Sequence, residues 1–410
     1  MERTDSYEKV NPILRDIMKT VFDSRRIFPV EYLSSLRKEV VNDKISCQLW
    51  FISPGCSHDN RGGCTMCNYG YGKGFHFDKK LVLDSIKDNL KELEGEVIQE
   101  LVVGPTGSFF DNLEVPAALR REIYTLLADV DIENLCFETR CDTITYEKLR
   151  EIREYAKTKT ITIEVGVECT NEWILRNCVN KGQTLKEVRD AVSMIHEMGM
   201  RTSANISLGI PFVDDQLGVE LALKSVEDAF GWGFDEVVIF TYHIKPGTLL
   251  EVLDRNHLYK TVSLWSLVET LYRVPESYLG KLSIAWYKNY YGKESPLIIK
   301  SPETCPVCES EVIALLDAFK NKPTRQLVES LYGFACDCRT AWYQSLAFGR
   351  DDPMENCIKG FQKTAEIYNI DQNLIEREAA YMRESWSFPY DSIQISMRNL
   401  AYGVEEIRFS

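Results

Sequence analysis

The feature that most constrains this chain is an alternation of strand-like and helix-like segments through its first two thirds. Short β-branched and aromatic runs alternate with longer segments whose apolar residues recur at helical spacing. Parallel strands joined by crossover helices form a sheet that is covered on its faces. The predicted strands are residues 45–53, 100–104, 134–139, 160–168, 201–210 and 235–244, and the predicted helices are residues 81–93, 115–127, 185–198 and 219–232.

Six such units are typical of a partial or complete α/β barrel with its chemistry at the carboxyl ends of the strands. An open, doubly wound sheet is the alternative that the same pattern allows. After residue 261 the alternation fades into helical segments at residues 309–321, 325–332, 339–348 and 371–385. We therefore predict a helical N-terminal extension (1–44), a barrel (45–262) and a mostly helical C-terminal domain (263–410).

Composition excludes several classes of protein. With 410 residues, 44% of them hydrophobic and 27% charged, the chain is a globular protein rather than a disordered one. It has no apolar run of about 18 residues and no secretory leader pattern, so we expect no membrane contact and a cytoplasmic location. The net charge of -14 argues against a broad basic surface for nucleic acid, although a local patch could exist. In the cytoplasm, 13 cysteines indicate metal or redox chemistry rather than disulfides.

Three cysteines follow the first predicted strand with the spacing CX7CX2C: Cys56, Cys64 and Cys67. They lie on a glycine-rich loop, whose backbone can fold closely around a metal centre. Three thiolates without a fourth suit an iron–sulfur cluster in which one iron has no protein ligand and can bind another molecule. A structural zinc site instead needs four protein ligands. His58 could supply a fourth ligand, so zinc stays an alternative here.

This loop, placed after the first strand of a predicted barrel, resembles that of the radical S-adenosylmethionine (SAM) superfamily. The resemblance implies a partial (β/α)6 barrel and a [4Fe-4S] cluster held by Cys56, Cys64 and Cys67 as the catalytic cysteines. It also implies cleavage of SAM to a 5'-deoxyadenosyl radical, with electrons from a reductant such as flavodoxin or ferredoxin. The wide first gap is similar to the elongator-like branch and, more closely, to the archaeosine-forming radical SAM family, which modifies a deazaguanine in tRNA.

Companion segments extend the resemblance over about residues 45–260. Residues 104–111 (GPTGSFFD) stand where the superfamily holds the SAM amino group, and an ordinary turn is the alternative. Glu138 and Arg140 resemble the pair that meets the ribose and carboxylate of SAM, and a structural ion pair is the alternative. Glu168 and Arg176, before an Asn-Lys-Gly turn, resemble SAM contacts of the elongator-like branch. The other SAM-binding residues that the resemblance implies are Tyr69, Gly104, Thr106, Gly107, Ser108, Ser207 and Gly209.

Two later segments each have two interpretations. Residues 243–248 (HIKPGT) could lie at the mouth of a pocket or cap a strand. Residues 286–292 (WYKNYYG) could stack on a planar substrate, although core packing is the favoured interpretation.

Four more cysteines form two close pairs near the C-terminus, with the spacing CX2C and CXC: Cys305 and Cys308, then Cys336 and Cys338. Four thiolates in two pairs can close a tetrahedral zinc site. An auxiliary [4Fe-4S] cluster uses the same ligands, so both metals stay open. The remaining six cysteines are expected to be small buried hydrophobic residues.

Three hypotheses for function follow. The first is a radical SAM enzyme that abstracts hydrogen from a small molecule, an amino acid or a nucleoside-like compound, which the acidic charge favours. The second is the archaeosine-type reaction with tRNA as the partner, which the fourth- and fifth-strand segments and the C-terminal cysteines favour. The third is a non-catalytic scaffold with zinc at both groups of cysteines.

Overall fold

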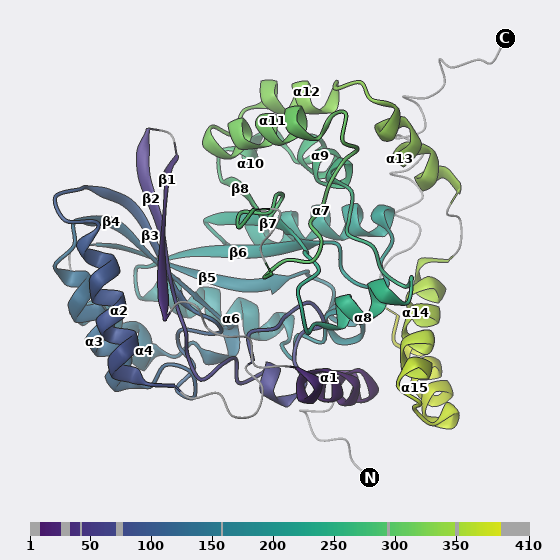
Figure 1. Cartoon of the computed structure of the whole chain (residues 1–410), viewed down its shortest axis with the longest axis horizontal. Coiled ribbons are helices and arrows are strands. Elements are labelled where there is room, and N and C mark those ends of the chain that lie inside the picture. Colours follow the sequence, from purple (N-terminus) through teal and green to yellow (C-terminus); the bar gives the residue numbers. More distant parts are fainter. Residues whose placement is uncertain are drawn as a thin grey trace.

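The centre of the molecule is one eight-stranded sheet whose strands lie in sequence order (Figure 1). The computed structural model describes residues 9–25, 33–41, 43–70, 77–156, 159–292, 296–348 and 352–386. The strands are β1 (Ser34–Val41), β2 (Lys44–Phe51), β3 (Ile98–Pro105), β4 (Ile132–Thr139), β5 (Thr160–Glu168), β6 (Arg201–Leu208), β7 (Glu236–Thr241) and β8 (Leu282–Ala285).

Strands β2 to β8 pair in parallel, and only β1 runs antiparallel to its neighbour among the described strands. The six predicted strands correspond to β2 to β7. Because strand order follows chain order and the two edge strands do not pair with each other, the sheet is a half-barrel. The predicted partial barrel is confirmed, and the doubly wound alternative is wrong, since that fold reverses its strand order partway along the sheet.

The N-terminal extension differs from its prediction. Helix α1 (Pro12–Ser24) is present and begins at Asn11, whose side chain accepts hydrogen bonds from two backbone N–H groups of the first turn. Residues 34–41 are strand β1 rather than helix, because their alternating side chains suit an edge strand that folds back on β2.

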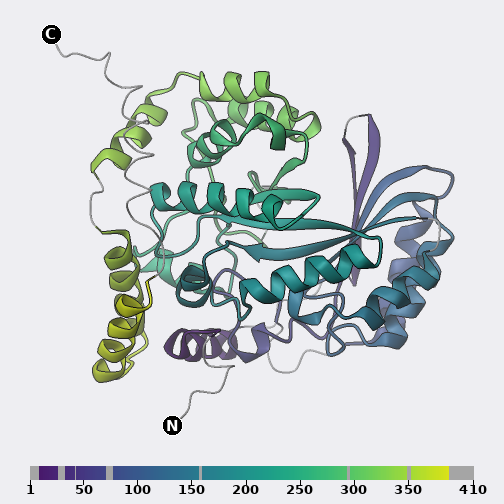
Figure 2. The same cartoon turned by 180° about the vertical axis from the view of Figure 1, so that it is seen from behind.

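Amphipathic helices cover the outer face of the sheet (Figures 1 and 2). The helix between β5 and β6 is a representative case: Thr184 and Glu187 form a capping box at its start, and its buried residues recur at spacings of three and four. These helices are α2 (Lys79–Lys91), α3 (Ala117–Ala128), α4 (Tyr146–Tyr155), α6 (Leu185–Glu197) and α7 (Asp215–Gly231). They leave the inner face of the sheet open to a cavity.

The C-terminal third is mostly helical, as predicted, and lies in two places. One group packs beside β7 and β8, while the last two helices pack against α1, which brings the two ends of the described chain together. The helices are α8 (Leu249–Arg255), α9 (Leu264–Arg273), α10 (Glu276–Leu279), α11 (Glu309–Asn321), α12 (Arg325–Tyr332), α13 (Asp337–Phe348), α14 (Pro353–Ile367) and α15 (Gln372–Glu384). Of the helices described, none combines the length and the apolar character needed to span a membrane.

Candidate active site

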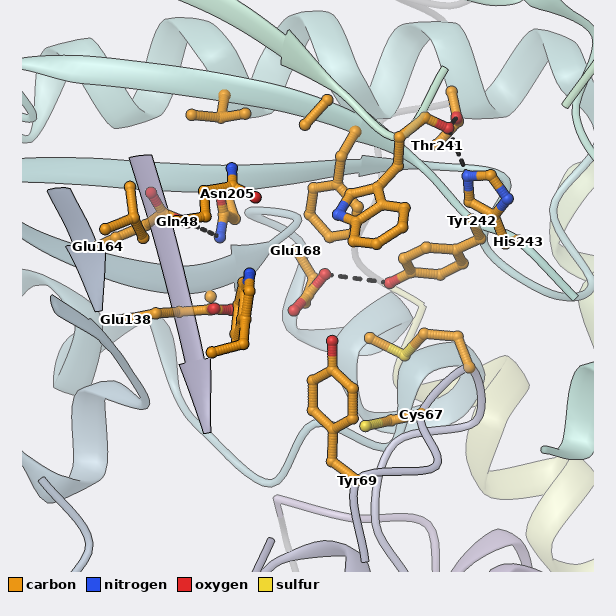
Figure 3. A pocket seen from close by; sticks show the side chains of 18 of the residues that line it. Gln48, Cys67, Tyr69, Glu138, Glu164, Glu168, Asn205, Thr241, Tyr242 and His243 are labelled. Carbon is orange, nitrogen blue, oxygen red and sulfur yellow. Dashed lines mark hydrogen bonds between the residues drawn. The ribbon is translucent and has the colours of Figure 1, made fainter. Parts of the chain in front are cut away.

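A cavity of about 330 Å³ lies against the inner face of the half-barrel. Every second residue of a strand points to this face, and many of these residues are polar. A complete barrel fills its interior with branched apolar side chains, so the polar lining here indicates a binding site rather than a core. Figure 3 shows its polar part, which includes Gln48, Glu138, Glu164, Glu168 and Asn205.

The cysteine loop, residues 56–70, closes one end of the cavity, and Cys56, Cys64 and Cys67 line it. Across the described chain, only the four C-terminal cysteines bring three or more His, Cys, Asp or Glu ligand atoms within 4.8 Å of one another. The three sulfurs of the loop form no such compact group. A cluster with one iron per thiolate does not require one.

His58 is not placed as a fourth zinc ligand. Its Nε2 donates a hydrogen bond to the carbonyl of Asn180, at 2.9 Å. Burial lowers the pKa of His58 to about 4, so the imidazole is neutral and serves as this donor. A histidine that donates one ring N–H to a carbonyl can still bind a metal through its other nitrogen. Among the described residues, however, His58 and the loop cysteines form no compact group of metal ligands.

Two distant residues hold the loop from behind. Arg25, which follows α1, forms a buried ion pair with Asp59 and donates to the carbonyl of Cys67 at 2.8 Å. Asn180 donates through its amide to the carbonyls of Gly62 and Gly63, at 2.8 and 2.9 Å. Asn180 has a left-handed backbone (φ 57°), a conformation that asparagine tolerates better than most residues. The Asn-Lys-Gly turn therefore positions the cysteine loop, a role that the sequence pattern did not reveal.

Arg140 anchors the first cysteine from the other side. It donates to Asp111 at 2.8 Å and to Glu114 at 2.9 Å, and its guanidinium lies 3.6 Å from the sulfur of Cys56. Glu114 in turn accepts the backbone N–H of Ser57 at 2.9 Å. Burial raises the pKa of Glu114 to about 7. Sequence reasoning missed Glu114, and the acidic partners of Arg140 are Asp111, Glu114 and Asp142 rather than the predicted Glu138.

Glu168 stands at an irregularity where β5 ends. Its φ is +66°, and the pairing with β6 shifts register between Gly166 and Glu168. Its carboxylate accepts from Lys181 at 2.6 Å, from the hydroxyl of Tyr242 at 3.1 Å and from Ser207. Although burial opposes it, the pKa of Lys181 is raised by Glu168 and Cys64, so Lys181 is charged. Backbone strain at a strand end beside a buried ion pair is typical of a functional site.

Two further carboxyl groups lie deeper in the half-barrel, and we call Glu138 and Glu164 the deep carboxylates. They are register partners on β4 and β5. Burial and mutual repulsion raise the pKa of Glu138 to about 8, and burial raises the pKa of Glu164 to about 7. Asn205 donates to Glu164 at 2.7 Å (Figure 3). Two adjacent buried carboxyls resist ionising together, so this part of the cavity favours a ligand that donates hydrogen bonds or carries positive charge.

Residues from the end of β7 and beyond β8 line the cavity beside the cysteine loop. The ammonium of Lys245 lies 4.9 Å from the ring centre of Tyr69 and 5.4 Å from that of Trp286. His243 donates to the carbonyl of Trp286 at 2.6 Å. Tyr287 is buried in the core, as the core-packing interpretation expects. Trp286 lines the cavity, where stacking on a planar substrate stays a prediction.

The structure brings together some of the predicted site residues and separates others. Gly104 lies under Trp50, and Gly209 packs against Tyr259 and Val262. The guanidinium of Arg176 pairs with Glu378 on α15 at 2.7 Å, away from the cavity. The predicted residues that line the cavity are Cys56, Cys64, Cys67, Tyr69, Gly107, Glu138, Arg140 and Glu168. Those outside its lining are Gly104, Thr106, Ser108, Arg176, Ser207 and Gly209.

The comparisons with known proteins agree with this geometry. Residues 50–224, which include the cysteine loop, match the family model described as the radical SAM superfamily. The chain is 27% identical to archaeosine synthase subunit beta of Methanosarcina acetivorans, over 72% of this chain and 83% of that protein. It is also 27% identical to archaeosine synthase subunit beta of Thermococcus kodakarensis, over 74% of this chain and 92% of that protein.

Two solved structures align with parts of this chain. An archaeal Elp3 from Methanocaldococcus infernus is 16% identical, with a TM-score of 0.42 over 63% of this chain and 58% of that chain. Methylornithine synthase is 16% identical, with a TM-score of 0.44 over 69% and 72% of the two chains.

Residues 50–224 are a radical SAM domain, and the chain is an enzyme. Among curated proteins it is similar to the archaeosine synthase beta subunits, so the predicted resemblance is confirmed and the scaffold hypothesis is wrong. Its cofactors are a [4Fe-4S] cluster and SAM, with a further metal site possible at the four C-terminal cysteines. Enzymes of this superfamily need a reductant.

Proposed function

We propose that this enzyme uses the 5'-deoxyadenosyl radical to modify a deazaguanine base of tRNA, in an archaeosine-synthase-like reaction. The observation that carries the proposal is that the cysteine loop, the Glu168–Lys181 pair and the deep carboxylates all face one cavity. A cofactor at the loop and a substrate in the deep part would then be neighbours.

In this proposal the cysteine loop holds the cluster through Cys56, Cys64 and Cys67. When bound, the cluster and SAM supply a radical that takes a hydrogen atom from the substrate. The SAM contacts proposed for the chain are the residues of the predicted set that line the cavity: Tyr69, Gly107, Glu138, Arg140 and Glu168. Arg140 and Lys181 place positive charge beside Cys56 and Cys64 respectively, where a carboxylate ligand would be stabilised.

The deep part of the cavity suits a guanine-type base. Such a base carries neighbouring N–H donors on its pyrimidine edge, and one carboxylate can accept two of them. Glu164, held by Asn205, is the proposed acceptor. Trp286 offers a flat face in the lining of the same cavity. This acidic interior is unfavourable for phosphate, so the phosphates of a nucleic acid would stay outside.

A small group of cations lies beside the cavity and suits those phosphates. Arg37, Lys288 and Lys320 surround the ring of Tyr290, at 4.0, 5.6 and 5.5 Å from its centre. Burial and repulsion from Arg37 and Lys288 lower the pKa of Lys320 to about 8. A nearby polyanion would relieve this repulsion. Arg37 and Lys320 pair with Glu39, and Lys288 pairs with Asp317, so these three cations exceed their acidic partners by one charge. This small excess is the local charge offered to an RNA substrate on a chain whose net charge is -14.

The relatives support the same proposal, and their name describes a subunit. A second protein subunit is therefore a proposed partner, besides a reductant such as flavodoxin or ferredoxin. A small-molecule substrate, an amino acid or a free nucleoside, is the second candidate. The net charge of -14 and the two deep carboxylates of the cavity favour it.

One anaerobic assay separates these candidates. The reconstituted enzyme is given SAM, a reductant and one of three additions: tRNA with a deazaguanine base, the same tRNA with guanine, or the free deazaguanine nucleoside. We expect only the first tRNA to accelerate formation of 5'-deoxyadenosine and to change in mass, with and without candidate partner subunits. Equal acceleration by the free nucleoside would show that tRNA is not required, and no acceleration by either would refute the deazaguanine assignment.

The base-recognition step has its own test. Loss of a charged hydrogen-bond acceptor costs about 1.5–3 kcal/mol, so Glu164→Gln should raise the KM for the substrate about 10- to 100-fold. Glu122→Gln is the matched control, because Glu122 pairs with Lys79 between two outer helices and does not line the cavity. An unchanged KM for Glu164→Gln would remove Glu164 from the substrate site.

A further inference from the structure

The four C-terminal cysteines form a compact group of free thiols. The sulfur of Cys305 lies 3.6 Å from that of Cys308 and 3.5 Å from that of Cys336. The sulfur of Cys338 lies 3.5 Å from those of both Cys308 and Cys336. A disulfide needs about 2.05 Å between sulfurs, so none of these pairs is bonded. All four sulfurs lie within 4.8 Å of one another.

We propose that these four cysteines hold a single tetrahedral Zn²⁺, and that no auxiliary iron–sulfur cluster forms there. Zinc–thiolate bonds of about 2.3 Å place the corners of a tetrahedron about 3.8 Å apart, close to the separations observed. A [4Fe-4S] cluster attaches each thiolate to a different iron, and its four sulfurs must stand much farther apart. The geometry therefore resolves the choice that the sequence left open.

The surroundings of the group fit thiolates. Cys308 immediately precedes α11, and Cys336 immediately precedes α13, so both pairs lie at the positive ends of helices. The indole N–H of Trp265 donates to the sulfur of Cys338 at 3.2 Å. Four thiolates on Zn²⁺ carry a net charge of about -2, which these dipoles and this donor offset. Binding is a proton-for-metal exchange and requires no oxidant or reductant.

The zinc site would connect the helical layer to the wall of the cavity. It fixes the starts of α11 and α13 next to Trp265 on α9. Helix α11 carries Lys320, which lines the cavity and pairs with Glu39 on β1 at 2.7 Å. It also carries Asp317, which accepts from Lys288 at 2.6 Å. None of the four cysteines is among the described residues that line the cavity, so the site is structural rather than part of the reaction centre.

The test uses the full-length chain with its first cluster removed. The triple variant Cys56→Ala/Cys64→Ala/Cys67→Ala keeps all four C-terminal cysteines and is purified, then reconstituted anaerobically with iron and sulfide. We expect about one zinc per chain, almost no iron or sulfide, and no iron–sulfur absorbance. Replacing the zinc with Co²⁺ should give the visible absorption bands of tetrahedral cobalt tetrathiolate.

Two outcomes would overturn the proposal. About four irons and four sulfides per chain in the triple variant would show an auxiliary cluster. A single iron, or no metal, would also exclude the zinc site. A second variant, Cys336→Ser, should lose the zinc and the cobalt spectrum. If that variant fails to fold, titration of the triple variant with a mercurial reagent provides the alternative readout, since zinc should be released as the four thiols react.

Discussion

The two groups of cysteines differ in what surrounds them. In the cysteine loop, three thiols face a cavity, and polar side chains from distant segments hold the loop in place: Arg25, Arg140 and Asn180. In the C-terminal group, four sulfurs lie within 4.8 Å of one another, away from the cavity. An open set of ligands beside a cavity suits a cofactor that reacts with a ligand, whereas a closed set suits a metal that stabilises the fold.

The largest expected effect is the loss of iron from the cysteine loop, with the zinc of the C-terminal group unchanged. Cys64→Ala should reduce iron and sulfide from about four per chain to less than one, because two thiolates cannot retain the cluster. Zinc should stay unchanged. Metal and sulfide analysis of the purified protein measures both.

The matched control is Cys357→Ala, since Cys357 on α14 is fully buried and faces neither group of cysteines. Iron that stays at the wild-type level in Cys64→Ala would mean that the loop is not the cluster site.

The second prediction concerns stability. Cys336→Ser should lose zinc and lower the melting temperature by roughly 10 °C, because the metal joins the starts of α11 and α13. Thermal unfolding of the metal-loaded protein measures this. Ser345→Ala changes the same helix without touching the metal, and should retain both zinc and melting temperature. Equal melting temperatures for Cys336→Ser and the wild type would contradict a structural role.

The third prediction tests the buried ion pair between Glu168 and Lys181, which lies beside the cysteine loop. Glu168→Gln leaves Lys181 buried without its anion and should cost about 3–5 kcal/mol of unfolding free energy. Adding Lys181→Met should recover part of that loss. Urea unfolding of the single and double variants measures the coupling.

An exposed ion pair provides the control for this cycle. Lys186 and Asp190 are mostly exposed, so Lys186→Met should change stability by less than about 0.5 kcal/mol. Equal effects at the two pairs would show that Glu168 and Lys181 are not buried as described.

The smallest predicted effect is a pH dependence. Burial lowers the pKa of His243 from 6.5 to about 4, so the unfolded chain binds the proton first as the pH falls. The stability that the neutral imidazole provides is complete above about pH 6.5 and is lost as the pH falls toward 4, by about 1–3 kcal/mol. His243→Gln should remove this part of the pH dependence of stability, as measured by the free energy of unfolding at pH 5 and pH 7. An identical pH dependence in His243→Gln would mean that another group titrates.

The sequence predicted the half-barrel and its cysteine loop because hydrophobic periodicity and motif spacing are local properties. It did not predict β1, because the pairing of this strand with β2 depends on tertiary structure. It also missed Glu114, and it placed Arg176 at the SAM site although the side chain turns toward Glu378 on α15. Side-chain direction at the end of a strand depends on segments far away in sequence. For the same reason, the choice between zinc and iron at the second group needed sulfur–sulfur distances.

The most direct test of the central claim is the product of SAM at the cysteine loop. The reconstituted wild-type enzyme and the Cys56→Ala/Cys64→Ala/Cys67→Ala variant are each reduced anaerobically with SAM, and 5'-deoxyadenosine is quantified by mass spectrometry. The account predicts 5'-deoxyadenosine from the wild type and none from the variant, with zinc equal in both. Formation of 5'-deoxyadenosine by the variant, or its absence from a fully loaded wild-type enzyme, would contradict the account.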